Sequence, residues 1–191
     1  LKGLKMRIPG MGGEVFEQAG GTAINLPGGE IFTSMQTGVI DATEWVGPYN
    51  DLAFGLHQVA KYYYYPGWQE AGPTLEVLIN KEAWETLPED LQAILETASL
   101  AANTDMLAEY TARNNSALRE LINQHNVQLR QLPDDVLQEI KILSEQAITE
   151  MVKSEEDELS RRIYDSWNQY RKDVVAYHEI SERAYINARS K

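Results

Sequence analysis

Residues 40–70 have the sequence IDATEWVGPYNDLAFGLHQVAKYYYYPGWQE, where carboxylates, aromatic side chains and backbone breakers crowd together more densely than anywhere else in the chain. Glu44 and Trp45 follow a short apolar run, and the Gly-Pro pair that comes next prevents a strand from continuing. Four consecutive tyrosines, residues 62–65, favour a strand that also ends at a turn, and Glu70 lies just past it. We interpret this stretch as the ligand-facing edge of a binding lobe, with two acidic corners converging on one pocket.

The chain before this stretch alternates strand and helix patterns with short, glycine-rich connections. Such alternation predicts a mostly parallel sheet flanked by helices, in which ligands gather at the carboxyl ends of the strands. Arg7 and Glu44 both lie near such ends. Asn50 or Asp51 is expected in the N-cap region of the last helix of this part. The predicted strands are residues 5–8, 23–26, 39–42 and 73–80, and the predicted helices are residues 12–19, 28–37 and 49–60.

The second half of the chain has the apolar periodicity of long helices. A proline followed by acidic residues predicts a helix start near residue 88, and the helix continues for about ten turns. A brief extended piece follows, and the same start signal then predicts one final helix. We therefore expect an α/β ligand-binding lobe at residues 1–80, a long helix and connecting strand packed on it at residues 81–132, and a long C-terminal helix at residues 133–191.

Composition limits the function classes. The chain has 191 residues, of which 43% are hydrophobic, so it can bury a core of its own. The formal net charge of -12 argues against a nucleic-acid partner, because such binding draws on Lys and Arg against phosphate. No run approaches the roughly 20 apolar residues of a membrane helix, and the absence of cysteine is compatible with several compartments. The chain starts inside a strand pattern, so we expect another segment to come before it.

Four segments closely resemble the periplasmic solute-binding proteins of TRAP transporters. They are LKGLKMRIPG, GEIFTSMQTGVIDATEWVGPYNDL, KYYYYPGWQE and LINKEAWETLPEDLQ. Within that family the chain is most similar to the subgroup that binds 2-oxo acids or other small monocarboxylates together with a metal ion. The resemblance covers the whole chain. It implies ligand capture in the periplasm, delivery to the TRAP membrane subunits, no enzymatic activity, and an N-terminal lobe that comes before residue 1.

The resemblance also assigns roles to individual residues. Arg7 falls on the family's arginine that grips the ligand carboxylate, and a guanidinium presents a flat pair of donors that suits a carboxylate. From sequence alone, an ordinary surface arginine is the alternative. Glu44 and Trp45 match the D-A-T-E-W motif, and Glu70 matches the acid after Y-Y-Y-Y-P-G-W. The resemblance implies a sodium or calcium ion held by the two carboxylates and the Trp45 backbone carbonyl, since hard cations take oxygen ligands.

Other interpretations remain open from the residues alone. Zinc fits poorly, because there is no cysteine and the three histidines lack a zinc-ligand spacing. Two acids in one cleft also describe a glycoside hydrolase, although a complete set of nucleophile, base and oxyanion donors is not recognisable. A helical interaction protein would account for the last hundred residues only. The final helix carries an apolar stripe that packs on its own lobe, covers the preceding lobe or forms a homodimer. The stripe consists of Ile163, Trp167, Tyr170, Val174 and Tyr177.

Overall fold

The computed structural model describes residues 1–154 and 157–190. By packing, the chain divides into two units, Leu1–Lys141 and Ile142–Lys191. Within the described ranges, no helix combines the length and the apolar character needed to cross a membrane. The first unit is a mixed α/β structure with parallel strands and flanking helices, as the sequence predicts.

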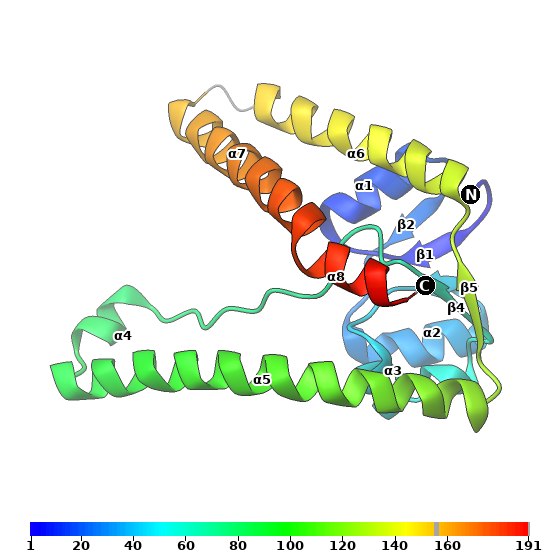
Figure 1. The fold of residues 1–191 in the computed structure, drawn as a ribbon, viewed down its shortest axis with the longest axis horizontal. Coiled ribbons are helices and arrows are strands. Elements are labelled where there is room, and N and C mark those ends of the chain that lie inside the picture. Colours follow the sequence, from blue (N-terminus) through cyan, green and yellow to red (C-terminus); the bar gives the residue numbers. More distant parts are fainter. Residues whose placement is uncertain (155–156, 191) are drawn as a thin grey trace. The chain divides into compact units, whose positions relative to one another are not determined.

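Three short strands form the sheet that carries the predicted site (Figure 1). They are β1 (Lys5–Arg7), β2 (Thr22–Ile24) and β3 (Ala42–Thr43), arranged in the order β2-β1-β3 with both pairs parallel. The central position of β1 places Arg7 between the ends of two neighbouring strands. The predicted strand at residues 39–42 is displaced: Val39 is exposed, Ile40 is buried, and pairing begins only at Ala42.

The helices between these strands follow the glycine signals in the sequence. Helix α1 (Gly10–Gln18) connects β1 to β2, and a 3-10 turn, η1 (Gly28–Glu30), leads into α2 (Ile31–Thr37). Gly38 ends α2 in the left-handed region at φ 75°, which glycine adopts without steric cost. Ile31 and Ile40 are almost fully buried beneath this connection, and their cluster also includes Leu56.

The helix predicted at residues 49–60 is two shorter pieces. Helix α3 (Pro48–Ala53) ends before Gly55, whose φ of 77° interrupts the helix, and the 3-10 turn η2 (Leu56–Gln58) follows. The apolar residues keep the spacing of one face, so the pattern alone did not reveal the break. Helix α3 packs against the long helix α5 (Glu89–Asn123), whose 35 residues agree with the prediction of about ten turns.

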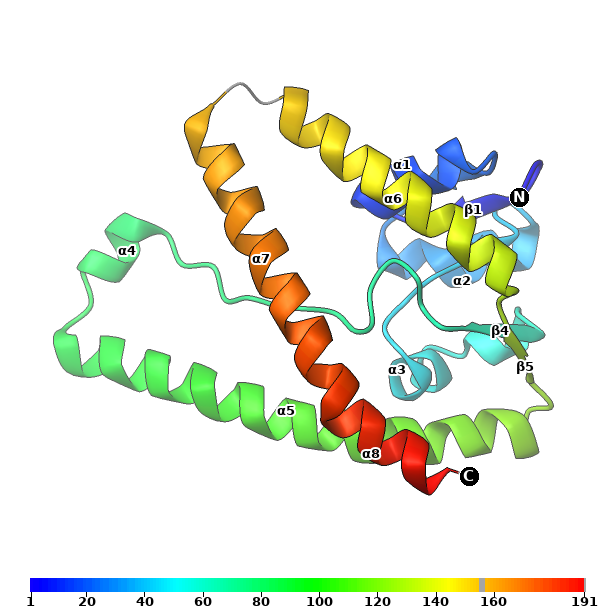
Figure 2. The same ribbon diagram turned by 45° about the horizontal axis from the view of Figure 1, so that its top comes forward.

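The prediction of a strand at residues 73–80 is wrong. These residues form neither a helix nor a strand in the described chain, and their apolar side chains are exposed, with Leu78 at 85%. A second, two-stranded parallel sheet is formed instead by β4 (Tyr62–Tyr65) and β5 (Gln128–Gln131). Helix α4 (Lys81–Glu85) and the first half of α5 extend away from both sheets in Figures 1 and 2.

The prediction of one final helix is also wrong. Helix α6 (Asp134–Ser154) and helix α7 (Glu158–Ile180) are separate, and the backbone at Asp157 is extended. The Asp157 carboxylate accepts a hydrogen bond from the Ser160 amide at 2.8 Å, which starts α7 as a capped helix. Helix α8 (Glu182–Arg189) completes the chain. Most of the apolar stripe on α7 is exposed, with Tyr170 at 70%.

Candidate functional site

Arg7 and Glu44 form a partly buried ion pair at the carboxyl edge of the three-stranded sheet. Arg7 ends β1 and Glu44 directly follows β3, and the Glu44 amide donates a hydrogen bond to the Arg7 carbonyl at 3.3 Å. The Arg7 Nη1 donates to Glu44 Oε1, and each side chain is 12% exposed. Parallel pairing of the strands therefore brings together two of the predicted site residues that lie 37 positions apart in the sequence.

The Arg7 guanidinium is held from three directions. Its Nε donates to the Leu26 carbonyl at 3.2 Å, its Nη1 is bound to Glu44, and its Cζ lies 5.6 Å from the centroid of the Trp45 ring. A cation over an indole face is a favourable arrangement. Among the described residues, Nη2 has no hydrogen-bond partner. One edge of the guanidinium is therefore left for an anionic group.

Trp45 is packed rather than free on the surface. Its ring stacks on Phe54 with centroids 5.4 Å apart and an interplanar angle of 21°. The ring also lies so close to Gly28 that a Cβ there would come within 2.6 Å of a ring carbon. The Gly28 position therefore requires glycine because of this close approach. Together with Arg7, these contacts fix the direction of the segment that carries Glu44.

Three carboxylates influence one another at this edge. Burial is the largest cause that raises the pKa of Glu44, and the negative charges of Glu70 and Asp51 raise it further. The charge and hydrogen bond of Arg7 act in the opposite direction but do not cancel these effects. Glu70, in the exposed loop after β4, is thus near enough to interact with Glu44 electrostatically. A cation beside these groups would relieve their mutual repulsion.

Asp51 lies next to the predicted site, and the sequence did not indicate its role there. Asn50 or Asp51 was expected in the N-cap region, but neither is a cap, since Gly47 occupies the N-cap position of α3 and no side chain caps that helix. Instead Asp51 is 7% exposed and accepts hydrogen bonds from the Tyr63 hydroxyl at 2.5 Å and the Gly47 amide at 3.3 Å. Burial raises the pKa of Asp51, while hydrogen bonds from Tyr63 and from the Gly47 and Val46 amides lower it.

Two histidines that are distant in sequence also meet. The rings of His57 and His125 have centroids 3.9 Å apart, and both line a small hollow where η2 approaches the segment after α5. Burial lowers the pKa of His57, with the neighbouring His125 charge as a second cause. His125 Nε2 lies 3.7 Å from a Glu120 carboxylate oxygen. The sequence separation concealed this pair, which joins His57 of the 40–70 stretch to a histidine after α5 and includes none of the four predicted site residues.

The donors near Glu44 fit a hard cation better than zinc. Carboxylate oxygens of Glu44 and Glu70 and the Trp45 carbonyl oxygen are the kind of ligand that sodium and calcium take. In the part of the chain that the structure describes, no three His, Asp or Glu side chains are grouped so that they alone could hold a metal ion. A cation here would therefore need further oxygen ligands, from a bound carboxylate or from another part of the protein.

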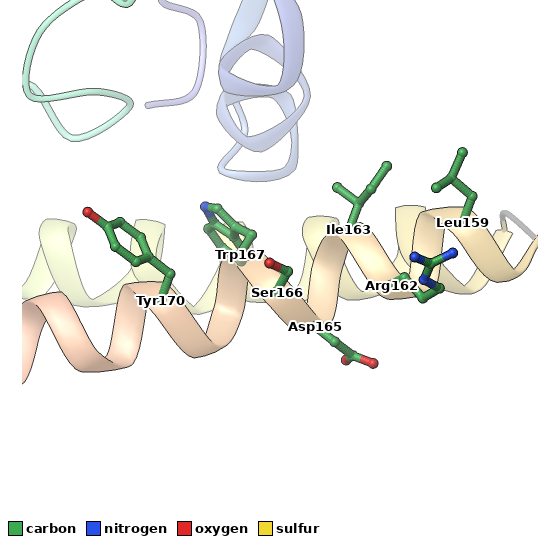
Figure 3. A pocket seen from close by; sticks show the side chains of 7 residues that line it. All are labelled: Leu159, Arg162, Ile163, Asp165, Ser166, Trp167 and Tyr170. Carbon is green, nitrogen blue, oxygen red and sulfur yellow. The ribbon is translucent and has the colours of Figure 1, made fainter.

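A further hollow lies along α7 and contains none of the four predicted site residues. Figure 3 shows that Leu159, Ile163, Trp167 and Tyr170 project to one side of this helix, while Asp165 points to the opposite side. The hollow is an open strip of side chains on a single helix, unlike the enclosed contacts around Arg7. It shares Ile163, Trp167 and Tyr170 with the apolar stripe that the sequence predicts for packing or dimerisation.

Comparison with known proteins bears on the whole chain. Residues 1–155 match the model of the DctP family, described as bacterial extracellular solute-binding protein, family 7. The chain is 42% identical over 187 residues to a monocarboxylate 2-oxoacid-binding periplasmic protein of Nostoc sp. strain PCC 7120, covering 98% of this chain and 50% of that protein. The chain thus spans about half the length of the curated relative that it matches.

Two crystal structures are similar over nearly all of the chain. One is a TRAP periplasmic solute-binding protein from Pseudoalteromonas atlantica T6c with bound sodium and pyruvate, at 38% identity and a TM-score of 0.90, covering 98% of this chain and 56% of that one. The other, from Bordetella bronchiseptica RB50, is a mixed-occupancy dimer with calcium and picolinate in one site. It is 36% identical with a TM-score of 0.91 and covers 100% of this chain and 58% of that one.

Proposed function

The chain belongs to the bacterial extracellular solute-binding proteins of family 7, and we propose that it is part of the substrate-binding component of a TRAP transporter. In this proposal it captures a small carboxylate such as a 2-oxo acid in the periplasm, together with a metal ion, and delivers it to the membrane subunits. The relatives with pyruvate or picolinate and sodium or calcium support this ligand class.

The Arg7–Glu44 ion pair is the observation that carries the proposal. The pair sits at the carboxyl ends of adjacent parallel strands, where α/β folds bind ligands, and it is largely shielded from solvent. A buried guanidinium with a free edge suits a carboxylate, because two parallel hydrogen bonds add both strength and direction. Arg7 therefore binds the ligand carboxylate in this proposal.

The carboxylates on the other side of the pair suit the cation. Glu44 and Glu70 would repel an anionic ligand if nothing intervened, and their interaction is already visible in the raised pKa of Glu44. We propose that these two side chains and the Trp45 carbonyl hold the sodium or calcium ion. The bound ion supplies positive charge that links the ligand carboxylate to the acidic side of the site.

A second lobe is part of this proposal. The chain covers about half the length of its relatives, and the first unit has a large apolar surface that its own residues leave exposed. This surface lies on residues 74–80 and on the first half of α5. We propose that a preceding lobe covers it and closes over the ligand, and we call the resulting molecule the two-lobed protein.

Support for an enzyme is weaker. A glycoside hydrolase needs one carboxylic acid and one carboxylate free to act on the sugar, whereas Glu44 is engaged by Arg7. The matched family is one of solute-binding proteins.

A homodimer through α7 is proposed on a separate observation, the exposed apolar stripe, and a dimeric relative supports it.

Calorimetry on the two-lobed protein tests this function. Pyruvate is titrated in sodium chloride, in calcium chloride, and in choline chloride with a chelator. The proposal predicts saturable heat only with one of the metal ions and no chemical change in the recovered pyruvate. The 191-residue chain alone is expected to bind at millimolar strength or weaker, because half of the enclosure is missing. Binding that is indifferent to the cations, or turnover of pyruvate, would contradict the proposal.

A further inference from the structure

We propose that Asp51 and Tyr63 are positioning residues that lock the Glu44–Trp45 segment onto strand β4, and that the Asp51 charge strengthens cation binding. This inference rests on the proposed function, because it concerns how the same site is assembled. Neither residue belongs to the ligand set that the sequence resemblance implies.

The geometry places Asp51 between the two segments that carry the acidic ligands. Glu44 and Trp45 lie immediately before Val46 and Gly47, whose amides bind the Asp51 carboxylate. The same carboxylate receives the Tyr63 hydroxyl at 2.5 Å. Tyr63 belongs to β4, and the chain leads from this strand to Glu70. One buried side chain thus connects the Glu44 segment to the Glu70 segment.

The hydrogen bonds favour a charged Asp51. Its carboxylate accepts from three donors, the Tyr63 hydroxyl and the Gly47 and Val46 amides. A protonated carboxyl group would instead need an acceptor for its own proton. Burial and the Asp51 charge both raise the pKa of Tyr63, so the phenol keeps the proton that it donates. The pair is therefore a neutral donor held on an anionic acceptor.

The charge of Asp51 lies beside the segment that carries the proposed ligands, because its carboxylate accepts the Gly47 amide at 3.3 Å, two residues after Trp45. Asp51 contributes to the raised pKa of Glu44, as Glu70 does. Among the groups that act on Glu44, Arg7 alone brings positive charge, against the three carboxylates of Glu44, Glu70 and Asp51. The excess of negative charge attracts a cation, and outer groups that orient and charge a metal site commonly affect its affinity.

Two substitutions in the two-lobed protein separate the effect of the Asp51–Tyr63 hydrogen bond from the effect of the Asp51 charge. Asp51→Asn keeps the size of the side chain but removes its charge, whereas Tyr63→Phe keeps the charge and removes the hydroxyl. Tyr64→Phe is the matched control on β4, since Tyr64 is exposed. Asp165→Asn is the control for loss of one acid, because Asp165 points away from the apolar side of α7 (Figure 3).

Calcium chloride is titrated into each variant by calorimetry with pyruvate present, at several ionic strengths, and thermal unfolding is recorded in parallel. Asp51→Asn is expected to weaken calcium binding by about 10- to 100-fold and to flatten its dependence on salt. Tyr63→Phe is expected to weaken it by about tenfold with the salt dependence unchanged. Both controls should match the wild type. A role in stability alone would lower the unfolding temperature without changing calcium affinity or its salt dependence.

The outcomes separate this inference from the proposed function. If the wild type binds calcium and pyruvate but Asp51→Asn and Tyr63→Phe bind calcium within twofold of it, the positioning role is overturned and the proposed function stands. If the wild type binds neither calcium, sodium nor pyruvate, the proposed function itself falls, and this inference with it.

Discussion

Aromatic side chains serve opposite purposes in the two units of the chain. In the first unit Trp45 stacks on Phe54 and lies against Arg7, and Tyr63 is hydrogen-bonded to a buried carboxylate. In the second unit Trp167 and Tyr170 project from α7 with 44% and 70% of their surface exposed. Trp167 contacts only neighbours on its own helix, with the Tyr164 ring 5.9 Å and the Arg171 Cζ 5.3 Å from its ring centroid among the contacts of the described residues, and it remains exposed. The residue types are the same, but the first set packs against other segments of its unit.

The difference teaches how to interpret an exposed apolar stripe. Burial of apolar surface is the main favourable term in folding, and extended exposed patches on soluble proteins usually mark an interaction. The Trp45 ring packs against Phe54 and Arg7 of the same unit and is therefore a fixed part of the site. Most of the α7 stripe remains exposed within the second unit, so we expect a surface outside this unit to cover it.

The largest effect is expected at the Arg7–Glu44 ion pair, whose contacts all lie within the first unit. Arg7→Ala in the two-lobed protein removes one member of a shielded charge pair and the donors for the ligand, at a cost of about 2–5 kcal/mol in ligand binding. Pyruvate affinity should fall about 30-fold or more by calorimetry. Arg7→Lys should recover only part of it, because an ammonium cannot replace the planar donors. Arg130→Ala, at an exposed arginine of β5, is the control, and equal losses in both would refute a specific role.

The second prediction concerns the exposed apolar stripe on α7 and its proposed role in a homodimer. Replacing Trp167 and Tyr170 by aspartate places charges within an apolar interface and should convert a dimer to a monomer at tens of micromolar in sedimentation experiments. Pyruvate affinity should change little. Asp165→Asn changes the opposite side of the same helix and should leave the dimer intact. A wild type that is already monomeric under these conditions would remove the dimer from consideration.

The meeting of Arg7 and Glu44 was more predictable from sequence than several of the elements around it. Arg7 and Glu44 meet because strand–helix alternation predicts parallel strands, and parallel strands present their carboxyl ends on one edge. Asp51 was misinterpreted because an acid at a helix start usually indicates a cap. Its actual partner, Tyr63, is positioned by β4 pairing with β5, 66 residues away along the chain, a contact that no local pattern contains.

The errors elsewhere have the same physical origin. Residues 74–80 alternate like a strand, but a strand needs a partner, and the described chain offers none. At Gly55 the apolar spacing of one helical face continues across a backbone break, so periodicity alone predicted a single helix. The stripe on α7 likewise indicates that one face of the helix is covered, but it does not indicate which surface covers it. A hydrophobic pattern specifies which face is covered, whereas the covering element depends on long-range or intermolecular contacts.

A smaller effect is expected where Gly28 approaches the Trp45 ring. Gly28→Ala would bring a methyl group within 2.6 Å of the Trp45 ring, and such overpacking typically costs about 1–3 kcal/mol. The neighbouring Gly29→Ala has no atom within 4 Å of the added carbon and should stay within about 0.5 kcal/mol of the wild type. Urea unfolding of the two variants measures the difference. Equal stabilities would mean that the packing around Trp45 is loose.

The smallest effects are expected in the pH dependence of stability, where the two units should differ in sign. Burial raises the pKa of Asp51 in the folded state above its usual value of about 3.9. The stability that this group contributes is therefore fully present below about pH 3.9 and is lost as the pH rises through its folded pKa. Asp51→Asn lacks this titration. Its unfolding temperature should rise relative to the wild type as the pH increases from about 4.

Asp157 provides the opposite case in the second unit. Hydrogen bonds from Ser160 lower the pKa of this exposed N-cap carboxylate, so its contribution is present above its unfolded pKa and is lost as the pH falls through the folded value. Asp157→Asn should therefore lose stability relative to the wild type at neutral pH and approach it in acid. Thermal unfolding of both variants from pH 3 to pH 8, each compared with the wild type, gives two difference curves. Curves that slope in the same direction would show that Asp51 is not held in a burial-dominated environment, and the contrast between an internally buried acid and an exposed cap would fail.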